Sequence, residues 1–423
     1  MDERKRLPQE IVDKIVDNFS KDFPTLRSIA LVSRAHLSRS RTHLFSSITL
    51  DQQRNSDGLH VLLTKNTALS TYIRIITLTI GMHDDSMRHT WLSQNITLPF
   101  ILDRLTSLCS FSFNLYPAIH WKHIHPRVTE ALFRVFARPT LSSIHFTGLY
   151  GIPDTFFNIS AFIQLLELRA VTFNCISDFD AESLQSLSVK ALVFEPMPVC
   201  LPEDQFELLP ALVTRPNACF ARITSLRIYP SDDNLSVILP VLKAAEKSLV
   251  SLELVHTYMA LPYAEGQGLS AFQFNLANLS NLSWLSITIG LLYSKSNHIK
   301  DCVSTSMQQL TTFLASATYT LAHIEKLTVI FSPLCMHPLY RVRHMAKHLS
   351  ELDVWEQLDT TISHCRSTAG LSVILVLMMK TDELTETLDM KKEWQESMPG
   401  KLPLLENRGS LTLDMESYSQ ARI

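Results

Sequence analysis

Two histidine-rich stretches come closest, by residue type and spacing, to a set of side chains that could do chemistry. One carries His120, His123 and His125, and the other carries His344 and His348. Imidazole nitrogens are common zinc ligands, and two histidines four residues apart lie on one face of a helix. Neither stretch has the matching cysteine or carboxylate pair of a zinc site, so we expect no bound metal.

The stretch around His344 is basic, and its positive charge opposes the binding of a metal ion. Met345 stands where zinc peptidases of the pattern His-Glu-x-x-His carry their catalytic glutamate. We therefore expect a basic surface helix here, with a local patch for an acidic partner as the alternative, and a solvent-exposed loop at residues 120–125. The basic residues of the helix are Arg341, Arg343 and Lys347.

Other catalytic signatures are missing from the sequence. It has 10 glycines and none of the glycine-rich patterns that cradle phosphate groups. It also has no Gly-x-Ser-x-Gly elbow, no kinase motif set and no Cys-His signature. We therefore expect no active site and no cofactor, so that the protein is not an enzyme.

The composition is that of an ordinary globular protein, with 46% hydrophobic and 19% charged residues among 423. The net charge of -3 gives no general attraction to nucleic acids or anionic membranes. The N-terminus lacks a signal-peptide pattern, and the longest apolar run, Leu371 to Met379, is too short to span a bilayer. Seven scattered cysteines fit reduced thiols. We expect a protein of the cytoplasm or nucleus that binds neither nucleic acid nor membrane.

One pattern, apolar-x-x-apolar-x-apolar, recurs along most of the chain and predicts strands whose last two apolar residues point into a core. Helical segments between the copies imply parallel strands joined by helical crossovers, an α/β fold. The copies are Phe45/Ile48/Leu50, Ile73/Ile76/Leu78, Leu108/Phe111/Phe113, Leu141/Ile144/Phe146, Leu165/Leu168/Ala170, Leu184/Leu187/Val189, Ile223/Leu226/Ile228, Leu249/Leu252/Leu254, Leu282/Leu285/Ile287, Ile324/Leu327/Val329 and Leu371/Ile374/Val376. The clearest helical segments are residues 127–136, 234–247, 302–317 and 351–365, and Pro240 is expected to kink or split the second.

This pattern resembles the strand portion of a leucine-rich repeat, which implies a curved solenoid with its parallel strands on the concave face. The spacing is irregular, and the asparagine that usually follows the strand is mostly missing, so the array would be degenerate. The alternative is an ordinary α/β sheet domain. A helix at 382–394 and a last strand at 411–413 could cap the array, as a C-terminal cap of residues 382–423.

Residues on either side of the second apolar position of each copy would face outward from the concave side and could bind a substrate. Their mixed charge fits recognition of a protein or peptide better than of a nucleic acid. Trp284 is of special interest, because exposed tryptophan is common at binding hot spots. The candidates are Arg169, Arg227, Glu253, Trp284 and Lys326.

The first 45 residues predict three short helices that lead directly into the first strand copy. Leu7, Ile11 and Ile15 repeat every four residues, with Val12 and Val16 beside them, and form one apolar helical face. Pro24 opens a second helix with Leu26, Ile29 and Ala30 facing inward, and a third, basic helix ends near Leu44-Phe45. So short a segment cannot be very stable alone and should pack on a partner or a larger domain.

This segment resembles the F-box of fungal F-box proteins. The matching pieces are Leu7-Pro8-x-Glu10-Ile11, then Leu31-Val32-Ser33-Arg34, then Leu44-Phe45 leading into Ile48-Thr49-Leu50. His36 departs from the family, in which many members carry tryptophan. The resemblance covers about a tenth of the chain and divides it into an F-box-like domain, residues 1–45, and a repeat domain, residues 46–423.

The resemblance implies a substrate-recognition subunit of an SCF-type cullin–RING ubiquitin ligase. The N-terminal helices would bind a Skp-family adaptor, and the repeat domain would bind an unknown protein substrate. The positions that match the adaptor-binding residues of the family are Leu7, Pro8, Ile11, Ile15, Leu31 and Val32. The alternative is a protein-binding scaffold with no ubiquitin role, whose N-terminal helices only cap the solenoid. Burial of the first helix's apolar face within the chain would favour the cap, whereas exposure would favour the adaptor.

Overall fold

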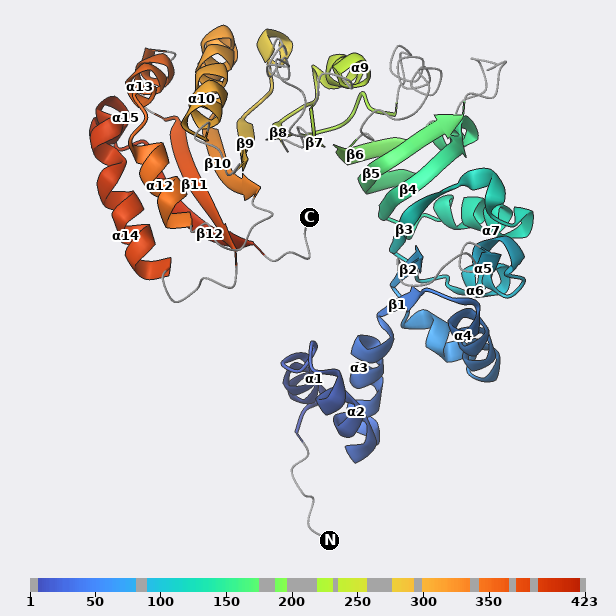
Figure 1. Ribbon diagram of the computed structural model, residues 1–423. Coiled ribbons are helices and arrows are strands. Elements are labelled where there is room, and N and C mark those ends of the chain that lie inside the picture. Colours follow the sequence, from blue (N-terminus) through green and yellow to red (C-terminus); the bar gives the residue numbers. More distant parts are fainter. Residues whose placement is uncertain are drawn as a thin grey trace. The chain divides into compact units, whose positions relative to one another are not determined.

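The computed structural model describes ten segments of the chain: residues 7–80, 90–174, 187–195, 219–230, 235–256, 276–292, 299–334, 342–364, 370–380 and 387–418. The chain divides into two compact units, formed mainly by Met1–Lys190 and by Leu209–Ile423, and Ala191–Val199 belongs to the second. Both units are α/β, and all paired neighbouring strands described below are parallel (Figure 1).

In the first unit, the strands lie side by side in the order in which they occur in the sequence, β1-β2-β3-β4-β5. Helices α4, α6 and α7 lie along one side of them (Figure 1). The strands are β1 (Ser47–Leu50), β2 (Ile75–Ile80), β3 (Ser110–His120), β4 (Ser143–Pro153) and β5 (Phe162–Asn174). The helices are α1 (Gln9–Asp17), α2 (Phe23–Val32), α3 (Arg34–Phe45), α4 (Gln53–Lys65), α5 (Thr90–Gln94), α6 (Leu98–Arg104) and α7 (Pro126–Phe136), with short 3-10 turns η1 (Thr67–Thr71), η2 (Trp121–His123) and η3 (Asp154–Asn158).

The second unit repeats this arrangement with strands in the order β6 to β12. The strands are β6 (Ser188–Glu195), which begins in the first unit, β7 (Ser225–Ile228), β8 (Ser251–His256), β9 (Trp284–Leu292), β10 (Lys326–Leu334), β11 (Ser372–Lys380) and β12 (Leu411–Tyr418). The helices are α9 (Leu235–Ala245), α10 (Ile299–Ser316), α11 (Thr318–Leu321), α12 (Val342–Ser350), α13 (Trp355–His364), α14 (Thr387–Ser397) and α15 (Pro403–Asn407), with 3-10 turns η7 (Leu276–Asn278) and η9 (Pro399–Lys401).

The four clearest helical segments of the sequence form α7, α9, α10 and α13. Pro240 lies inside α9, which the structure describes as one helix, so the segment is not split there. Residues 382–386 lie outside the described part of the chain, and the expected C-terminal helix is seen as α14. The last strand, β12, pairs with β11 along its whole length.

The apolar pattern correctly predicts the core-facing residues of most strands. Ile76 and Leu78 are buried and pair in register with Phe111 and Phe113 of the next strand. Leu252 and Leu254 pair in the same way with Leu285 and Ile287. This repeated register places equivalent apolar residues of neighbouring strands side by side in one core.

Three copies of the pattern were predicted in the wrong register. In β5 the core positions are Leu166 and Leu168, which pair with Ile144 and Phe146, and Ala170 is only half-buried. In β6 the residues paired with Leu226 and Ile228 are Leu192 and Phe194, and the predicted Leu184 lies outside the described residues. The predicted core residues Leu187 and Val189 are buried, but they lie five residues before Leu192 and Phe194, the residues that pair with β7.

The third error, in β11, changes the face on which side chains lie. Val373 and Leu375 pair with Leu327 and Val329 and are fully buried. Ile374 and Val376, which the pattern placed in the core, therefore lie on the opposite face of the sheet, where Ile374 is half-buried and Val376 is buried. A shift of one residue along a strand moves every side chain to the other face.

Aromatic side chains fill the core between strands and helices in both units. In the first unit, Phe136 of α7 packs against Phe111 of β3 and Phe146 of β4, with ring centroids 5.4 and 5.6 Å apart. In the second unit, Phe331 of β10 contacts Trp355 of α13 at 5.9 Å. In both units, the helices therefore cover the face of the strands that carries the core residues, such as Phe146 of β4 and Phe331 of β10. We call the face turned away from these helices the outer face.

Candidate protein-binding surfaces

The first helix, α1, packs on α3 through residues that are three or four positions apart. Gln9, Val12 and Val16 lie on this side: both valines are buried, and the Gln9 side-chain amide donates to the Ala35 carbonyl at 2.9 Å. Gln9 also donates to Asp13 at 2.8 Å. Because positions i, i+3, i+4 and i+7 share one helical face, this face of α1 is used within the chain.

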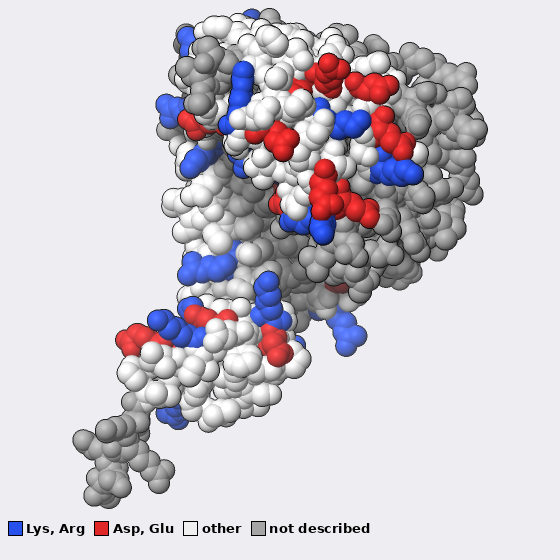
Figure 2. Space-filling model, turned by 90° about the vertical axis from the view of Figure 1, so that its left-hand side faces the viewer, with Lys and Arg blue, Asp and Glu red and all other residues white. Residues whose placement is uncertain are grey.

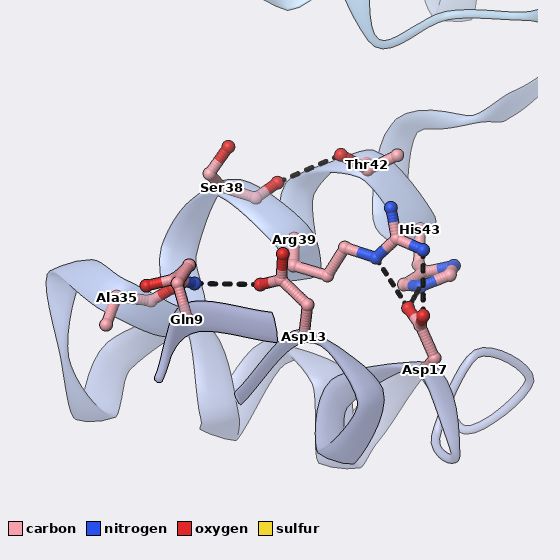
Figure 3. A network of polar contacts seen from close by, with 8 residues as sticks. All are labelled: Gln9, Asp13, Asp17, Ala35, Ser38, Arg39, Thr42 and His43. Atoms are coloured by element: carbon pink, nitrogen blue, oxygen red, sulfur yellow. Dashed lines mark hydrogen bonds and ion pairs between the residues drawn. The ribbon is translucent and has the colours of Figure 1, made fainter. Parts of the chain in front are cut away.

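Asp17, at the end of α1, holds the two helices together by charge. Its carboxylate accepts two hydrogen bonds from the Arg39 guanidinium, at 2.5 and 2.8 Å, and one from His43 Nε2 at 2.7 Å (Figure 3). These bonds favour the ionised form and lower the Asp17 pKa from 3.8 to about 2. The contact fixes α1 on α3 at the end opposite Gln9.

We expect the Asp17 contact to stabilise the N-terminal helices in a pH-dependent way. Because the folded pKa is lowered, the contribution is present above about pH 4 and is lost as the pH falls through about 2. Asp17→Asn should speed hydrogen exchange of α1 amides by about two- to fivefold at neutral pH, a modest effect because the pair is partly exposed. Wild type and variant should converge near pH 2. Asp13→Asn is the control, and an equal effect of both substitutions would contradict this account.

The opposite side of α1 is apolar and exposed. Leu7, Ile11 and Ile15 lie four residues apart and are 62%, 42% and 42% exposed. They are about a third of a helical turn away from the face that contacts α3. The single apolar face expected from the sequence is therefore two surfaces. Val12 and Val16 are buried within the chain, whereas Leu7, Ile11 and Ile15 are exposed.

The end of α2 adds a second exposed apolar group. Leu31 is 88% and Val32 73% exposed, whereas Leu26 earlier in the helix is fully buried. Pro8 is exposed just before α1, and its carbonyl accepts from the first turn of that helix. We define the N-terminal apolar patch as the six predicted adaptor residues together with two exposed phenylalanines: Leu7, Pro8, Ile11, Ile15, Phe19, Phe23, Leu31 and Val32.

His36, the departure from the F-box pattern, lies in the first turn of α3. Its Nδ1 is 2.7 Å from the hydroxyl of Ser33, the residue that precedes the helix. The side chain is half-buried and is used in this local contact. It lies four residues after Val32, at the start of the helix that follows the most exposed end of the patch.

On the outer face of the second unit, the predicted substrate-binding residues form two pairs. Arg227 of β7 donates to Glu253 of the neighbouring β8 at 2.6 Å. The Trp284 indole N–H of β9 donates to Thr328 at 3.3 Å, and Lys326 of β10 lies over the indole, 5.5 Å from its centre. Register brings Trp284 and Lys326 directly opposite each other, and Glu253 beside Ser286.

The fifth predicted residue, Arg169, lies on the outer face of the first unit. Glu167 accepts a hydrogen bond from Arg169 and another, at 2.7 Å, from His145 Nδ1 of β4. The His145 bond and the nearby Arg169 charge lower the Glu167 pKa from 4.5 to about 2. The ionised Glu167 carboxylate thus links β5 to β4 through His145, next to Arg169.

The same chain of contacts continues to a serine, an arrangement that the sequence did not predict. His145 Nε2 is 2.6 Å from the Ser143 hydroxyl, so serine, imidazole and carboxylate are connected as in a nucleophile, base and orienting acid. However, the Ser143 backbone N–H donates to the Cys109 carbonyl at 3.1 Å and is not available to an oxyanion. We therefore interpret Ser143–His145–Glu167–Arg169 as a structural hydrogen-bond chain.

The histidine-rich stretches do not form a metal site within the described residues, where no group of three or more ligating side chains occurs. His125 Nδ1 accepts from the Arg127 amide at the start of α7. The expected exposed loop at 120–125 is wrong in part, because Trp121 and Ile124 are buried. His344 and His348 do lie on a helix, α12, and His348 is 3.8 Å from Glu351. Of the residues around them, Arg341 lies outside the described residues, as do the side chains of residues 342–345.

Charge is mixed over the described surface. On the side drawn in Figure 2, basic and acidic residues are interspersed, and the N-terminal helices at the bottom of the view show a band of charged residues above an uncharged area. Where the chain is described, no helix is long and apolar enough to cross a bilayer. No protein-family model matches the sequence, and a search of curated proteins finds none similar to it.

Proposed function

We propose that this protein is the substrate-recognition subunit of an SCF-type cullin–RING ubiquitin ligase. The N-terminal helices would act as an F-box-like domain that binds a Skp-family adaptor. The following strand–helix units would form a degenerate leucine-rich-repeat-like solenoid that binds a protein substrate. Other subunits would carry out ubiquitin transfer, so the chain itself needs no active site.

The observation that carries the proposal is the exposure of the N-terminal apolar patch. Seven large apolar side chains of this patch are exposed, although the three helices bury only Val12, Val16 and Leu26 among their apolar residues. Burying one such side chain contributes about 1.5 to 3 kcal/mol, which is available to a partner. Several large exposed apolar side chains on one small group of helices are typical of protein interaction sites.

The alternative, a solenoid cap without a ubiquitin role, expects the opposite. A cap would turn Leu7, Ile11 and Ile15 toward the repeats and bury them. Instead, α1 contacts α3 through the side that carries Gln9, Val12 and Val16. The chain enters the repeats from α3, and a single residue separates α3 from β1. The exposed stripe favours an external partner.

The repeat part of the proposal is supported by strand order and register. Within each unit, successive strands are parallel neighbours and equivalent apolar residues pair from strand to strand. Helices return the chain between them, as leucine-rich repeats do. A rigid array of this kind would hold a substrate at a fixed distance from the ligase and raise its effective concentration near the conjugating enzyme.

Co-purification with a Skp-family adaptor tests the proposal. Wild-type protein should retain the adaptor, and Ile11→Asp should weaken the complex about tenfold or more, because a charge replaces an exposed apolar contact. Val61→Asp is the matched control, since Val61 is 48% exposed on α4, a helix outside the patch. The proposal fails if the wild type does not bind the adaptor, or if Ile11→Asp binds as well as wild type.

A further inference from the structure

The outer face of β9 to β11 combines partly exposed apolar residues with the positive charge of Lys326. Trp284 and Lys326 stand opposite each other at the start of β9 and β10. Further along, Thr328 pairs with Ile374, and Ile330 pairs with Val376. The corrected register of β11 places Ile374 and Val376 on this face, where Ile374 is partly exposed and Val376 is buried.

The indole of Trp284 extends this apolar surface toward β10. Its N–H donates to Thr328, the residue that lies between Ser286 of β9 and Ile374 of β11. Ser286 and Thr328 are buried, so few polar groups are accessible between the indole and the aliphatic residues. A large apolar side chain of a ligand could pack here at little cost in lost hydrogen bonds.

The charged residues of this face differ in whether their charge is neutralised. Arg227 is paired with Glu253, and Asp414 of β12 is paired with Lys391 at 2.6 Å. Lys326 is exposed and has no carboxylate within ion-pair distance among the described residues; its only contact of this kind is with the Trp284 ring. A cation beside an apolar surface selects a ligand that supplies both an anion and an apolar side chain.

We propose that the outer face of β9 to β11 binds an extended peptide segment with an acidic residue close to a large apolar residue. The carboxylate pairs with Lys326, and the apolar side chain packs on Trp284, Ile330 and Ile374, which are all partly exposed. Lys326 and Ile330 are four residues apart on one strand, about 13 Å, so the two ligand residues lie within about four positions of each other. This inference rests on the proposed function, since the peptide would belong to the substrate.

Selection from a phage-displayed library of random linear peptides on the full-length protein tests the inference. Wild type should select peptides that carry Asp or Glu within about four residues of a large apolar side chain. Lys326→Glu should weaken these peptides about tenfold or more and select Lys or Arg at the same place instead. Trp284→Ala should weaken both sets. Lys243→Glu, which reverses an exposed charge on helix α9, should change neither.

The inference is overturned if no peptide is selected, if the selected peptides lack the acidic residue, or if Lys326→Glu leaves the selection unchanged. Binding of a single-stranded RNA oligonucleotide that depends on Trp284, with no peptide selected, would also overturn it. Ile11→Asp separates this result from the proposed function, because it should weaken adaptor binding about tenfold or more and leave peptide selection intact. If the wild-type protein does not bind the adaptor but selects the expected peptides, the ligase role is refuted and the peptide-binding surface is supported.

Discussion

Replacing Phe136 by alanine is expected to destabilise the first unit by about 3 to 5 kcal/mol, the largest single-residue effect on stability that we predict. Phe136 is fully buried at the end of α7 and its ring contacts Phe111, Phe146 and Phe156, with centroids 5.4 to 5.6 Å apart. It therefore joins a helix to two strands and to the following 3-10 turn. Removing the ring leaves a cavity that the surrounding rings, fixed by their own strands, cannot close.

Thermal unfolding measures this effect. For a unit of this size, each kcal/mol lowers the midpoint by about 2 to 4 °C, so the transition of the first unit should fall by about 6 to 20 °C. Phe136→Leu, which keeps most of the volume, should cost less than half as much. Phe162→Ala is the matched control, because Phe162 is 57% exposed on β5 and should change the midpoint little. Equal effects at positions 136 and 162 would contradict the assigned core.

The sequence predicted strands well where polar and apolar residues alternate. In β2, Ile76 and Leu78 are separated and followed by threonines, so only one choice of core face is consistent with the pattern. In β11 the run from Val373 to Met379 is apolar throughout, and alternation gives no information about the face. The face is decided by pairing with β10, which a single sequence does not show.

The error in β5 has a different origin. Leu165/Leu168/Ala170 and Ile163/Leu166/Leu168 both fit the apolar pattern, and they differ by a shift of two residues. A shift of two keeps Glu167 and Arg169 on the outer face, so the predicted candidate residue was placed on the correct side although the register was wrong. The partner strand β4 selects the second set, because Phe146 lies opposite Leu168.

The N-terminal apolar patch was only partly readable from the sequence. Helical periodicity grouped Leu7, Ile11 and Ile15 with Val12 and Val16 as one broad face. Division of this face depends on contacts made by the residues after position 34, since Ala35 and Arg39 of α3 bind the polar side of α1. The same reasoning explains why the Ser143–His145–Glu167 chain was missed, because its members come from two strands that meet only in the folded sheet.

Replacing Leu31 by aspartate is expected to weaken adaptor binding more than any other single change in the patch. Leu31 is 88% exposed at the end of α2, beside the 73% exposed Val32, so a partner that covers this corner buries nearly the whole side chain. Losing a central apolar anchor costs about 2 to 3 kcal/mol, which corresponds to about a thirtyfold to hundredfold rise in Kd. Titration of the purified adaptor against wild type and variant by calorimetry measures the change.

The effect should appear in binding and not in folding. An exposed residue away from the core changes stability by less than about 0.5 kcal/mol, so the Leu31→Asp variant should unfold at nearly the wild-type temperature. Leu31→Gln, which adds no charge beside the C-terminal end of α2, should show most of the same loss of affinity. Leu62→Asp serves as the matched control, because Leu62 is 50% exposed on α4 outside the patch and should leave the Kd unchanged. If Leu31→Asp and Leu62→Asp weaken binding equally, the loss reflects added charge on the protein, and the patch is not the adaptor contact.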